Sequence, residues 1–321
     1  MENCLDFTVA IPTYNGEHRL PELLERLQNQ INTENLSWEI IVIDNNSTDN
    51  TYQLIQAYQK KWQCSYSLKY AFEAKQGAAY ARKRAVTEAK GRLIGFLDDD
   101  NYPMNNWVSA AYTFAKKHPQ AGAYGSQIHP EWEVEPPENF ERIAPFLAIT
   151  ERGNLPLVYE THKKLLPPSA GLVVRRQAWL DSVPNQPILT GRVTGNMLTS
   201  EDLEMLSYIQ KSGWEIWYNP EMEIYHQIPS SRLTKEYLIP FISGIGLSRY
   251  VTRMVNIKPF YKPIFTLAYM INDLRKIILH LIKYRHQVTI DLVASCEMHY
   301  FISSFISPLY LWKHGYLKIK Q

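Results

Sequence analysis

Cysteine and long apolar runs are both scarce in this chain of 321 residues. The three cysteines, Cys4, Cys64 and Cys296, are an odd number and lie far apart, which argues against a disulfide scaffold and against the usual spacings of zinc or redox sites. We therefore expect reduced thiols and a cytoplasmic location. The best apolar stretch, 264–271, meets charged residues well before the roughly 18 residues of a membrane span, and no signal-peptide pattern opens the chain.

Two nucleotide-binding motifs are also missing. After the first apolar run, 7–11, the chain reads Pro-Thr-Tyr-Asn-Gly16 rather than G-x-G-x-x-G, which argues against a dinucleotide-dependent oxidoreductase. A glycine-rich loop with a basic residue, which a sugar nucleotidyltransferase would place there, is absent as well. No nucleic-acid-binding motif accompanies the basic residues, so no nucleic acid is expected as a partner.

Acidic residues are scarce in the last part of the chain. Residues 229–321 hold 13 Lys+Arg against 4 Asp+Glu, a net +9, whereas residues 1–228 hold 21 against 28, a net −7. The basic part has a helical pattern, with Met270, Leu274, Ile277, Ile278, Leu281 and Ile282 on one side. Two interpretations stay open: the helix packs its apolar side onto the domain formed by residues 1–228, or it contacts an anionic membrane surface.

Apolar, β-favouring runs alternate with segments of helical periodicity through the first hundred residues. This pattern predicts an α/β fold, a Rossmann-like and mostly parallel sheet flanked by helices, with right-handed crossovers. Residues 1–228 are predicted to form one domain with halves 1–104 and 105–228, and residues 229–321 a basic, helical C-terminal extension. Strands are expected at 7–11, 39–44, 68–71, 92–97, 121–126, 170–174 and 214–218, and helices at 20–27, 51–62, 77–90, 105–117 and 201–212.

Four carboxylates close these predicted strands: Asp44 ends one run, and Asp98, Asp99 and Asp100 end another. Because the carboxyl ends of parallel strands meet at one edge of a sheet, these groups should gather there. Crowded carboxylates repel one another unless a cation joins them, and Mg²⁺ or Mn²⁺ would leave positions for diphosphate oxygens. The alternative for the triplet is an ordinary solvated turn.

Five motifs in this order resemble the family 2 glycosyltransferases with the GT-A fold. They are Val-Ala-Ile-Pro-Thr-Tyr-Asn15, Ile-Val-Ile-Asp44-Asn-Asn-Ser-Thr-Asp49, Gly77-Ala-Ala-Tyr-Ala-Arg82, Phe-Leu-Asp98-Asp-Asp100 and Ser200-Glu-Asp202. Each motif alone is weak, but their common order and spacing are specific. The resemblance covers roughly residues 5–230.

The resemblance implies a nucleotide-sugar donor, with uracil as the expected base. In family members the loop after the first strand cradles the nucleotide, an aspartate closing the second strand bonds the base, and a helix-borne arginine helps hold the nucleotide. The positions of this chain that match the donor site are Pro12, Thr13, Asn15, Asp44, Arg82, Asp98 and Asp99. Asp100 would coordinate the divalent metal, Mn²⁺ or Mg²⁺. His226 would be a further metal ligand, or else an ordinary packed histidine.

Asp202 matches the family's catalytic base, which takes the proton of the acceptor hydroxyl in a single inverting displacement. Glu201 would orient the acceptor. The alternative is that both acids simply begin a helix. Gly171 would let the sugar approach the backbone closely, or mark a strand entrance. Trp214 would stack on a sugar, or pack in the core.

Two departures from the family's polysaccharide synthases narrow the expected activity. The chain has Gln210-Lys-Ser-Gly-Trp214 where processive enzymes carry Gln-x-x-Arg-Trp, and no membrane spans are expected, so one sugar is transferred per encounter. The basic extension suits a glycan or lipid-linked glycan acceptor at the inner face of the plasma membrane, in exopolysaccharide or cell-surface glycan synthesis. A non-catalytic, nucleotide-sugar-binding scaffold of a glycan assembly complex is the alternative. The sequence leaves the oligomeric state open.

Overall fold

A computed structural model describes residues 4–161, 165–193 and 198–317. The chain divides into two compact units, and each is described by itself. The first comprises Met1–Glu131, Ala148–Pro184 and Tyr208–Gln227; the second comprises Trp132–Leu147, Asn185–Ser207 and Ile228–Gln321. The predicted basic extension thus shares its unit with two earlier segments. The domain boundary at residue 228 stays a prediction.

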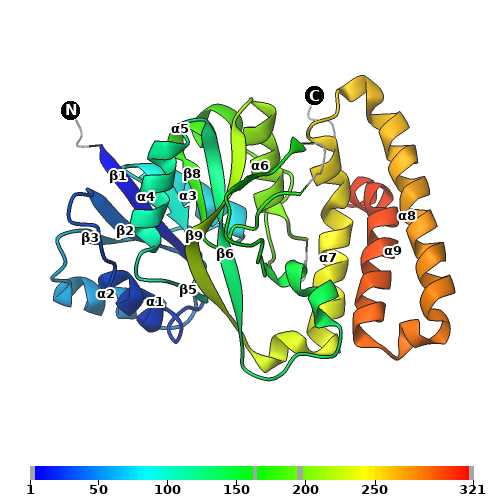
Figure 1. The fold of residues 1–321 in the computed structure, drawn as a ribbon, viewed down its shortest axis with the longest axis horizontal. Coiled ribbons are helices and arrows are strands. Elements are labelled where there is room, and N and C mark those ends of the chain that lie inside the picture. The colour runs from blue at the N-terminus through cyan, green and yellow to red at the C-terminus, as the bar shows by residue number, and fades with distance from the viewer. Residues whose placement is uncertain (1–3, 162–164, 194–197, 318–321) are drawn as a thin grey trace. The chain divides into compact units, whose positions relative to one another are not determined.

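The first unit opens with alternating strands and helices. The strands β1 (Leu5–Thr13), β2 (Trp38–Asp44), β3 (Ser67–Phe72) and β4 (Gly91–Phe96) pair in parallel in the order β3-β2-β1-β4. The helices α1 (Leu20–Gln28), α2 (Thr51–Lys61) and α3 (Ala78–Glu88) connect them (Figure 1). Every residue of β2 is buried, and α1 buries four leucines spaced along one face. This continuous apolar strand and one-sided helix are what the sequence pattern predicted.

The second half of the sheet changes direction. The strand β8 (Leu172–Arg175) pairs antiparallel with β4, and the order continues β8-β6-β9-β5. These strands are β5 (Asn101–Pro103), β6 (Ala121–Trp132), β7 (Leu157–Val158), which pairs with β9, and β9 (Glu215–Ile228); α4 (Trp107–Lys117) and α5 (Arg176–Ser182) accompany them. The predicted α/β fold is confirmed, but the sheet is mixed and its parallel pairs lie in the first half. Apolar runs indicate where strands lie and not their direction, which the connections set.

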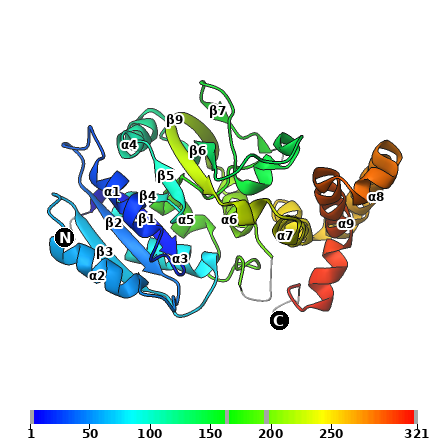
Figure 2. The ribbon, with the colours of Figure 1, turned by 90° about the horizontal axis from the view of Figure 1, so that it is seen from below.

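The second unit is helical. It contains α7 (Lys235–Met254), α8 (Lys262–Tyr284) and α9 (Leu292–Lys313), and α9 packs against both others (Figures 1 and 2). Small residues allow the closest approach: a Cβ on Gly246 of α7 would lie 2.6 Å from the Ser303 Cβ of α9. Short 3-10 helices occupy Phe140–Arg142, Ala144–Leu147, Ser230–Leu233, Pro259–Tyr261 and Arg285–Thr289. Across the described residues, none of the helices combines the length and apolar character needed to span a bilayer.

Candidate active site

Three loops at the carboxyl edge of the parallel strands are tied together by hydrogen bonds. The Asn15 amide N–H donates to Ser47 Oγ at 2.9 Å, and the Asn15 side-chain oxygen accepts from the Thr48 N–H at 2.8 Å. The Asn45 side-chain oxygen accepts from the Gly77 N–H at 2.7 Å. The loops after β1, β2 and β3 therefore form one connected rim, and the predicted donor-loop residue Asn15 is part of it.

Asp44 ends β2 opposite Thr13 in the β1 register, and its side chain is buried. One carboxylate oxygen accepts from the Ser47 N–H at 2.8 Å, and the other accepts from the Tyr70 hydroxyl at 2.9 Å. Burial and the adjacent Asp44 carboxylate both raise the pKa of Tyr70, so its hydroxyl remains a proton donor. Tyr70 was not predicted from the sequence, because a tyrosine inside a strand carries no signal of such a partner.

Asp99 is held between two side chains of the β1–α1 region. Its carboxylate accepts from Arg19 Nε at 2.7 Å, from Arg19 Nη2 at 2.9 Å and from Thr13 Oγ1 at 2.5 Å. Burial raises the pKa of Asp99, while the hydrogen bond from Arg19 opposes that rise. The contacts join the end of β4 to Thr13 and to the start of α1. Arg19 was also missed, because no periodic pattern connects it to Asp99.

Asp98 faces Arg82, the arginine predicted on α3. Arg82 Nη2 lies 3.2 Å from an Asp98 carboxylate oxygen and donates to Ser169 Oγ at 2.7 Å, with only 4% of the arginine side chain exposed. Ser169 belongs to the segment that leads into β8, together with Gly171. A φ of +64° at Gly171, and a distance of 2.5 Å from Ser126 Oγ to a Cβ built there, explain why glycine occupies this position.

Asp100 lies beside His226. Pairing of β5 with β9 sets Asn101 opposite His226, and His226 Nε2 is 3.7 Å from Asp100 Oδ2. Asn101 Nδ2 donates to Asp100 Oδ1 at 3.2 Å. Both Asp100 and His226 are buried, at 7% exposure each. A carboxylate and an imidazole this close suit a divalent cation.

Asp100 and His226 do not belong to a larger cluster of metal-ligating side chains. Within residues 4–161, 165–193 and 198–317, no group of three or more His, Cys, Asp or Glu residues could hold a metal ion. A metal at this pair would therefore take its other ligands from diphosphate oxygens or water, as Mg²⁺ sites commonly do.

Glu201 and Asp202 lie in the first turn of α6 (Glu201–Lys211), in the second unit. Ser200 precedes them with a φ of +71°. Asp202 Oδ1 accepts from the Leu203 N–H at 2.8 Å. Glu204, one turn into the helix, accepts from the Ile188 and Leu189 amides at 3.0 and 2.8 Å. The acids therefore occupy a helix start, as the alternative interpretation expected, and the base role of Asp202 stays a prediction.

Trp214 lies away from these groups. It precedes the first residue of β9, whereas His226 is near the end of that 14-residue strand. A Cβ built on Gly122 would lie 2.5 Å from the Trp214 Cβ, so the indole packs at the start of β6. The sheet thus brings together Thr13, Asp98, Asp99, Asp100, Arg82 and His226 through the contacts above and their places along the chain, with Gly171 in the segment of Ser169, and it does not bring Trp214 to them.

Curated proteins similar to this chain include two bacterial transferases. A poly(ribitol-phosphate) β-N-acetylglucosaminyltransferase, TarS, from Staphylococcus aureus is 31% identical over 115 residues, which are 36% of this chain and 19% of that protein. The Escherichia coli UDP-Glc:α-D-GlcNAc-diphosphoundecaprenol β-1,3-glucosyltransferase WfgD is 30% identical over 123 residues, 38% of this chain and 46% of that protein. The match thus spans less than half of either relative.

Solved structures and a family model point the same way. The S. aureus TarS 1-349 complex with UDP aligns with a TM-score of 0.52 at 17% identity, covering 97% of this chain and 92% of that one. The Pyrobaculum calidifontis mannosyltransferase PcManGT, with GDP-Man and Mn²⁺, gives a TM-score of 0.59 at 17% identity, covering 96% and 88%. These likenesses establish a shared fold. Residues 8–179 match the model described as "Glycosyl transferase family 2", which is more than half of the chain. The chain therefore belongs to glycosyl transferase family 2.

Proposed function

We propose that this protein is an inverting, metal-dependent glycosyltransferase that moves one sugar from a nucleotide sugar, a UDP sugar, to a hydroxyl of a glycan or lipid-linked glycan. The observation that carries the proposal is the pair Asp100 and His226, 3.7 Å apart where β5 pairs with β9. The neighbouring Asp99 is hydrogen-bonded to Thr13, the last residue of β1. The family membership supplies the reaction class.

The donor would lie along the rim formed by the loops after β1, β2 and β3. Asp44 offers its carboxylate to the base, and the Tyr70 hydroxyl and Ser47 amide fix its orientation. The backbone around Pro12, Thr13 and Asn15 would lie against the nucleotide. Because the loops are already hydrogen-bonded to one another, little ordering would remain to be done when the donor binds.

The diphosphate would lie beside the aspartate triplet. Asp98 would approach the ribose, and Arg82 would act beside it as a buried cation. Asp99 is proposed to support the donor loop through Thr13 and Arg19. Asp100 and His226 would hold Mn²⁺ or Mg²⁺, an ion that neutralises the charge developing on the departing nucleoside diphosphate.

The acceptor chemistry is assigned to the start of α6. Asp202 would take the proton of the attacking hydroxyl, and Glu201 would help to orient the acceptor. Gly171 would form the floor beside the sugar. The sugar and linkage are not specified by these residues.

The setting is proposed from the relatives. One acts on a poly(ribitol phosphate) and another on a diphosphoundecaprenol-linked sugar, as their names state. These support cell-surface polysaccharide or glycolipid synthesis, with the protein in the cytoplasm and peripheral at the inner face of the plasma membrane. The alternative is a scaffold that binds nucleotide sugar without turning it over.

A donor panel with Mn²⁺ distinguishes the two functions. Release of nucleoside diphosphate from UDP and GDP sugars is measured for wild type, for Asp202→Asn and for Asp181→Asn, a control acid on the surface of α5. We expect Asp202→Asn to keep UDP affinity within about twofold and to lower turnover by about 10²-fold or more, with Asp181→Asn unchanged. Equal turnover in Asp202→Asn would reject the base, and donor binding without turnover in wild type would favour the scaffold.

A further inference from the structure

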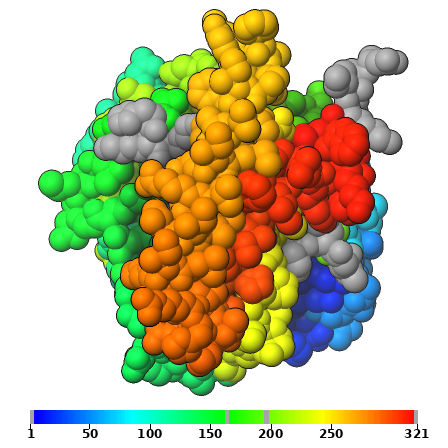
Figure 3. Space-filling view, turned by 90° about the vertical axis from the view of Figure 1, so that its right-hand side faces the viewer, coloured from blue at the N-terminus to red at the C-terminus, as the bar shows by residue number. Residues whose placement is uncertain are grey.

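One face of α8 is apolar and exposed along most of the helix. Isoleucine and leucine alternate on it at spacings of three and four residues, which keeps them on a single stripe. The stripe consists of Ile264 (63% exposed), Leu267 (62%), Ile271 (60%), Leu274 (44%), Ile278 (48%) and Leu281 (47%). At 23 residues the helix is about 34 Å long. Figure 3 shows α8, in orange, across this face of the molecule, with α9 in red beside it.

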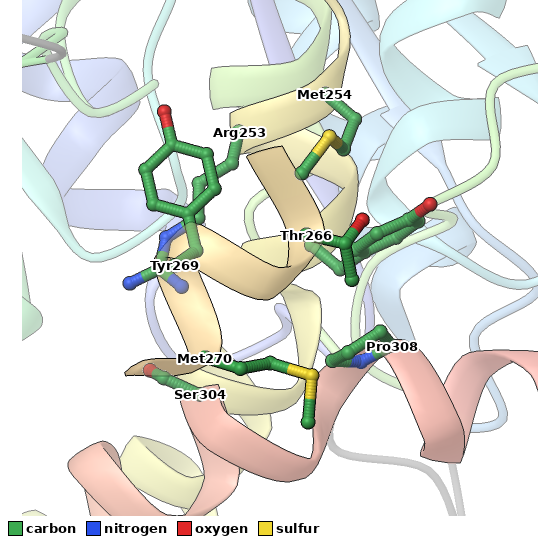
Figure 4. A pocket seen from close by; sticks show the side chains of 8 residues that line it. Arg253, Met254, Thr266, Tyr269, Met270, Ser304 and Pro308 are labelled. Atoms are coloured by element: carbon green, nitrogen blue, oxygen red, sulfur yellow. The ribbon is translucent and has the colours of Figure 1, made fainter. Parts of the chain in front are cut away.

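The opposite face of α8 is already occupied. Asp273 and His280 are buried there, and Asp273 accepts from both terminal nitrogens of Arg253 on α7, at 2.5 and 2.8 Å. Figure 4 shows Thr266, Tyr269 and Met270 of α8 with residues of α7 and α9 around a cavity. That cavity has a volume of about 10 Å³, room for roughly one water molecule. The helix therefore has a fixed inner side, and its outer stripe is a separate surface.

The charges around the stripe have one sign. Between residues 257 and 290 the basic residues are Lys258, Lys262, Arg275, Lys283, Arg285 and Lys276, the last of which is half-buried over the Phe301 ring of α9. The only acid in that segment is Asp273, which is buried against Arg253. An apolar stripe bordered by lysine and arginine is complementary to a lipid surface, in which anionic headgroups cover apolar acyl chains.

Exposed aromatic side chains lie near the start of α8 and the end of α9. Phe260 is 82% exposed just before α8, with Tyr261 beside it at 47%. Trp312, in the last turn of α9, is 73% exposed as well. Aromatic rings of this kind are favoured at the boundary between lipid headgroups and acyl chains.

We propose that the outer face of α8 docks on a membrane surface rich in anionic phospholipid, lying parallel to it. Leucine and isoleucine of the stripe enter the acyl boundary, and Arg275 and Lys283 meet the phosphate headgroups. A second copy of this chain is the competing occupant, since the same three-and-four spacing suits helix pairing. In such a pair, however, the basic borders of two α8 helices would meet without acidic partners, which disfavours it. The proposal stands independently of the transferase activity.

Vesicle flotation of the full chain tests this docking surface. The vesicles contain phosphatidylcholine alone or with about a third phosphatidylglycerol, at low and high salt. The apolar variant is Leu267→Glu with Ile271→Glu. Its control is Ile31→Glu with Leu155→Glu, which makes the same kind of change at two exposed side chains of the first unit. Ile31 is 51% exposed and Leu155 is 78% exposed. The charge variant is Arg275→Gln with Lys283→Gln.

We expect wild type to bind the anionic vesicles and to bind more weakly at high salt. The apolar variant should lose at least about tenfold in partitioning and its control less than about twofold. The charge variant should lose roughly fivefold for each basic residue removed. Circular dichroism checks that the variants fold, which their exposed positions favour. Absence of vesicle binding by wild type, or equal binding by the apolar variant, would overturn the proposal. So would a dimer in lipid-free buffer that the apolar variant dissociates.

Discussion

Replacing Asp273 by asparagine should strongly destabilise the helical second unit. In wild type the Asp273 carboxylate pairs with both terminal nitrogens of Arg253, and the two side chains are only 2% and 8% exposed. Removing one partner of a buried ion pair typically costs about 3–5 kcal/mol, because a charge stays buried without compensation. The Tyr269 ring, 4.8 Å from the guanidinium, is present in both proteins and does not change this difference. We expect a loss of about 3–5 kcal/mol.

Urea denaturation followed by far-UV circular dichroism measures this loss. The double variant Arg253→Met with Asp273→Leu should recover most of it, since replacing a whole buried pair by apolar groups is often nearly neutral. Glu22→Gln is the control, because the Arg26–Glu22 pair is on the surface and should contribute less than about 0.5 kcal/mol. A loss below about 1 kcal/mol for Asp273→Asn, equal to that of the control, would refute the assignment of Arg253 and Asp273 as the anchor of α8.

Three further substitutions test other contacts. Gly171→Ala should destabilise the protein by about 2–4 kcal/mol in thermal or urea unfolding, because its φ is +64° and its Cβ would meet Ser126 Oγ at 2.5 Å; a neutral change would contradict that geometry. Burial raises the pKa of Glu204 above its ordinary 4.5, so the stability that this group contributes is full below pH 4.5 and is lost as pH rises through the folded pKa. The free energy of unfolding should therefore fall as pH rises above 4.5. Glu204→Gln should abolish this fall, and an unchanged pH dependence of the free energy of unfolding would exclude Glu204 as its source. Tyr70→Phe should weaken UDP binding by roughly three- to tenfold in calorimetry by removing a hydrogen bond to Asp44; unaltered affinity would show that Asp44 needs no such support.

The sequence predicted the parts of the site that lie at strand ends. Asp44 and the triplet beginning at Asp98 follow continuous apolar runs, and parallel strands bring such positions to one edge. The side-chain partners could not be predicted in the same way. Arg19 reaches Asp99 and Tyr70 reaches Asp44 across separate elements, and periodicity describes only neighbours within one element.

The C-terminal helices were likewise predicted only in part from the sequence. The sequence pattern placed Met270 and Ile277 on the same apolar side as Leu274 and Ile278. In the structure the first two are partly buried on the inner side, and the other two are exposed. Apolar residues cover more than one face of this helix, and the sequence alone does not show which face packs against neighbouring helices and which stays exposed. The inner side of α8 packs on α7 and α9 of the same unit. Packing of α8 onto the predicted catalytic domain stays a prediction, and membrane contact is proposed for the outer side.

Asp100 and His226 are proposed to hold a divalent cation against the diphosphate of the donor. Calorimetric titration of UDP with and without Mn²⁺ tests this proposal most directly, in wild type, in Asp100→Asn with His226→Gln, and in the surface control Asp181→Asn. We expect Mn²⁺ to tighten UDP binding by about tenfold or more in wild type and in the control, and by less than about twofold in the double variant. An equal effect of Mn²⁺ on all three proteins, or no effect on wild type, would contradict it.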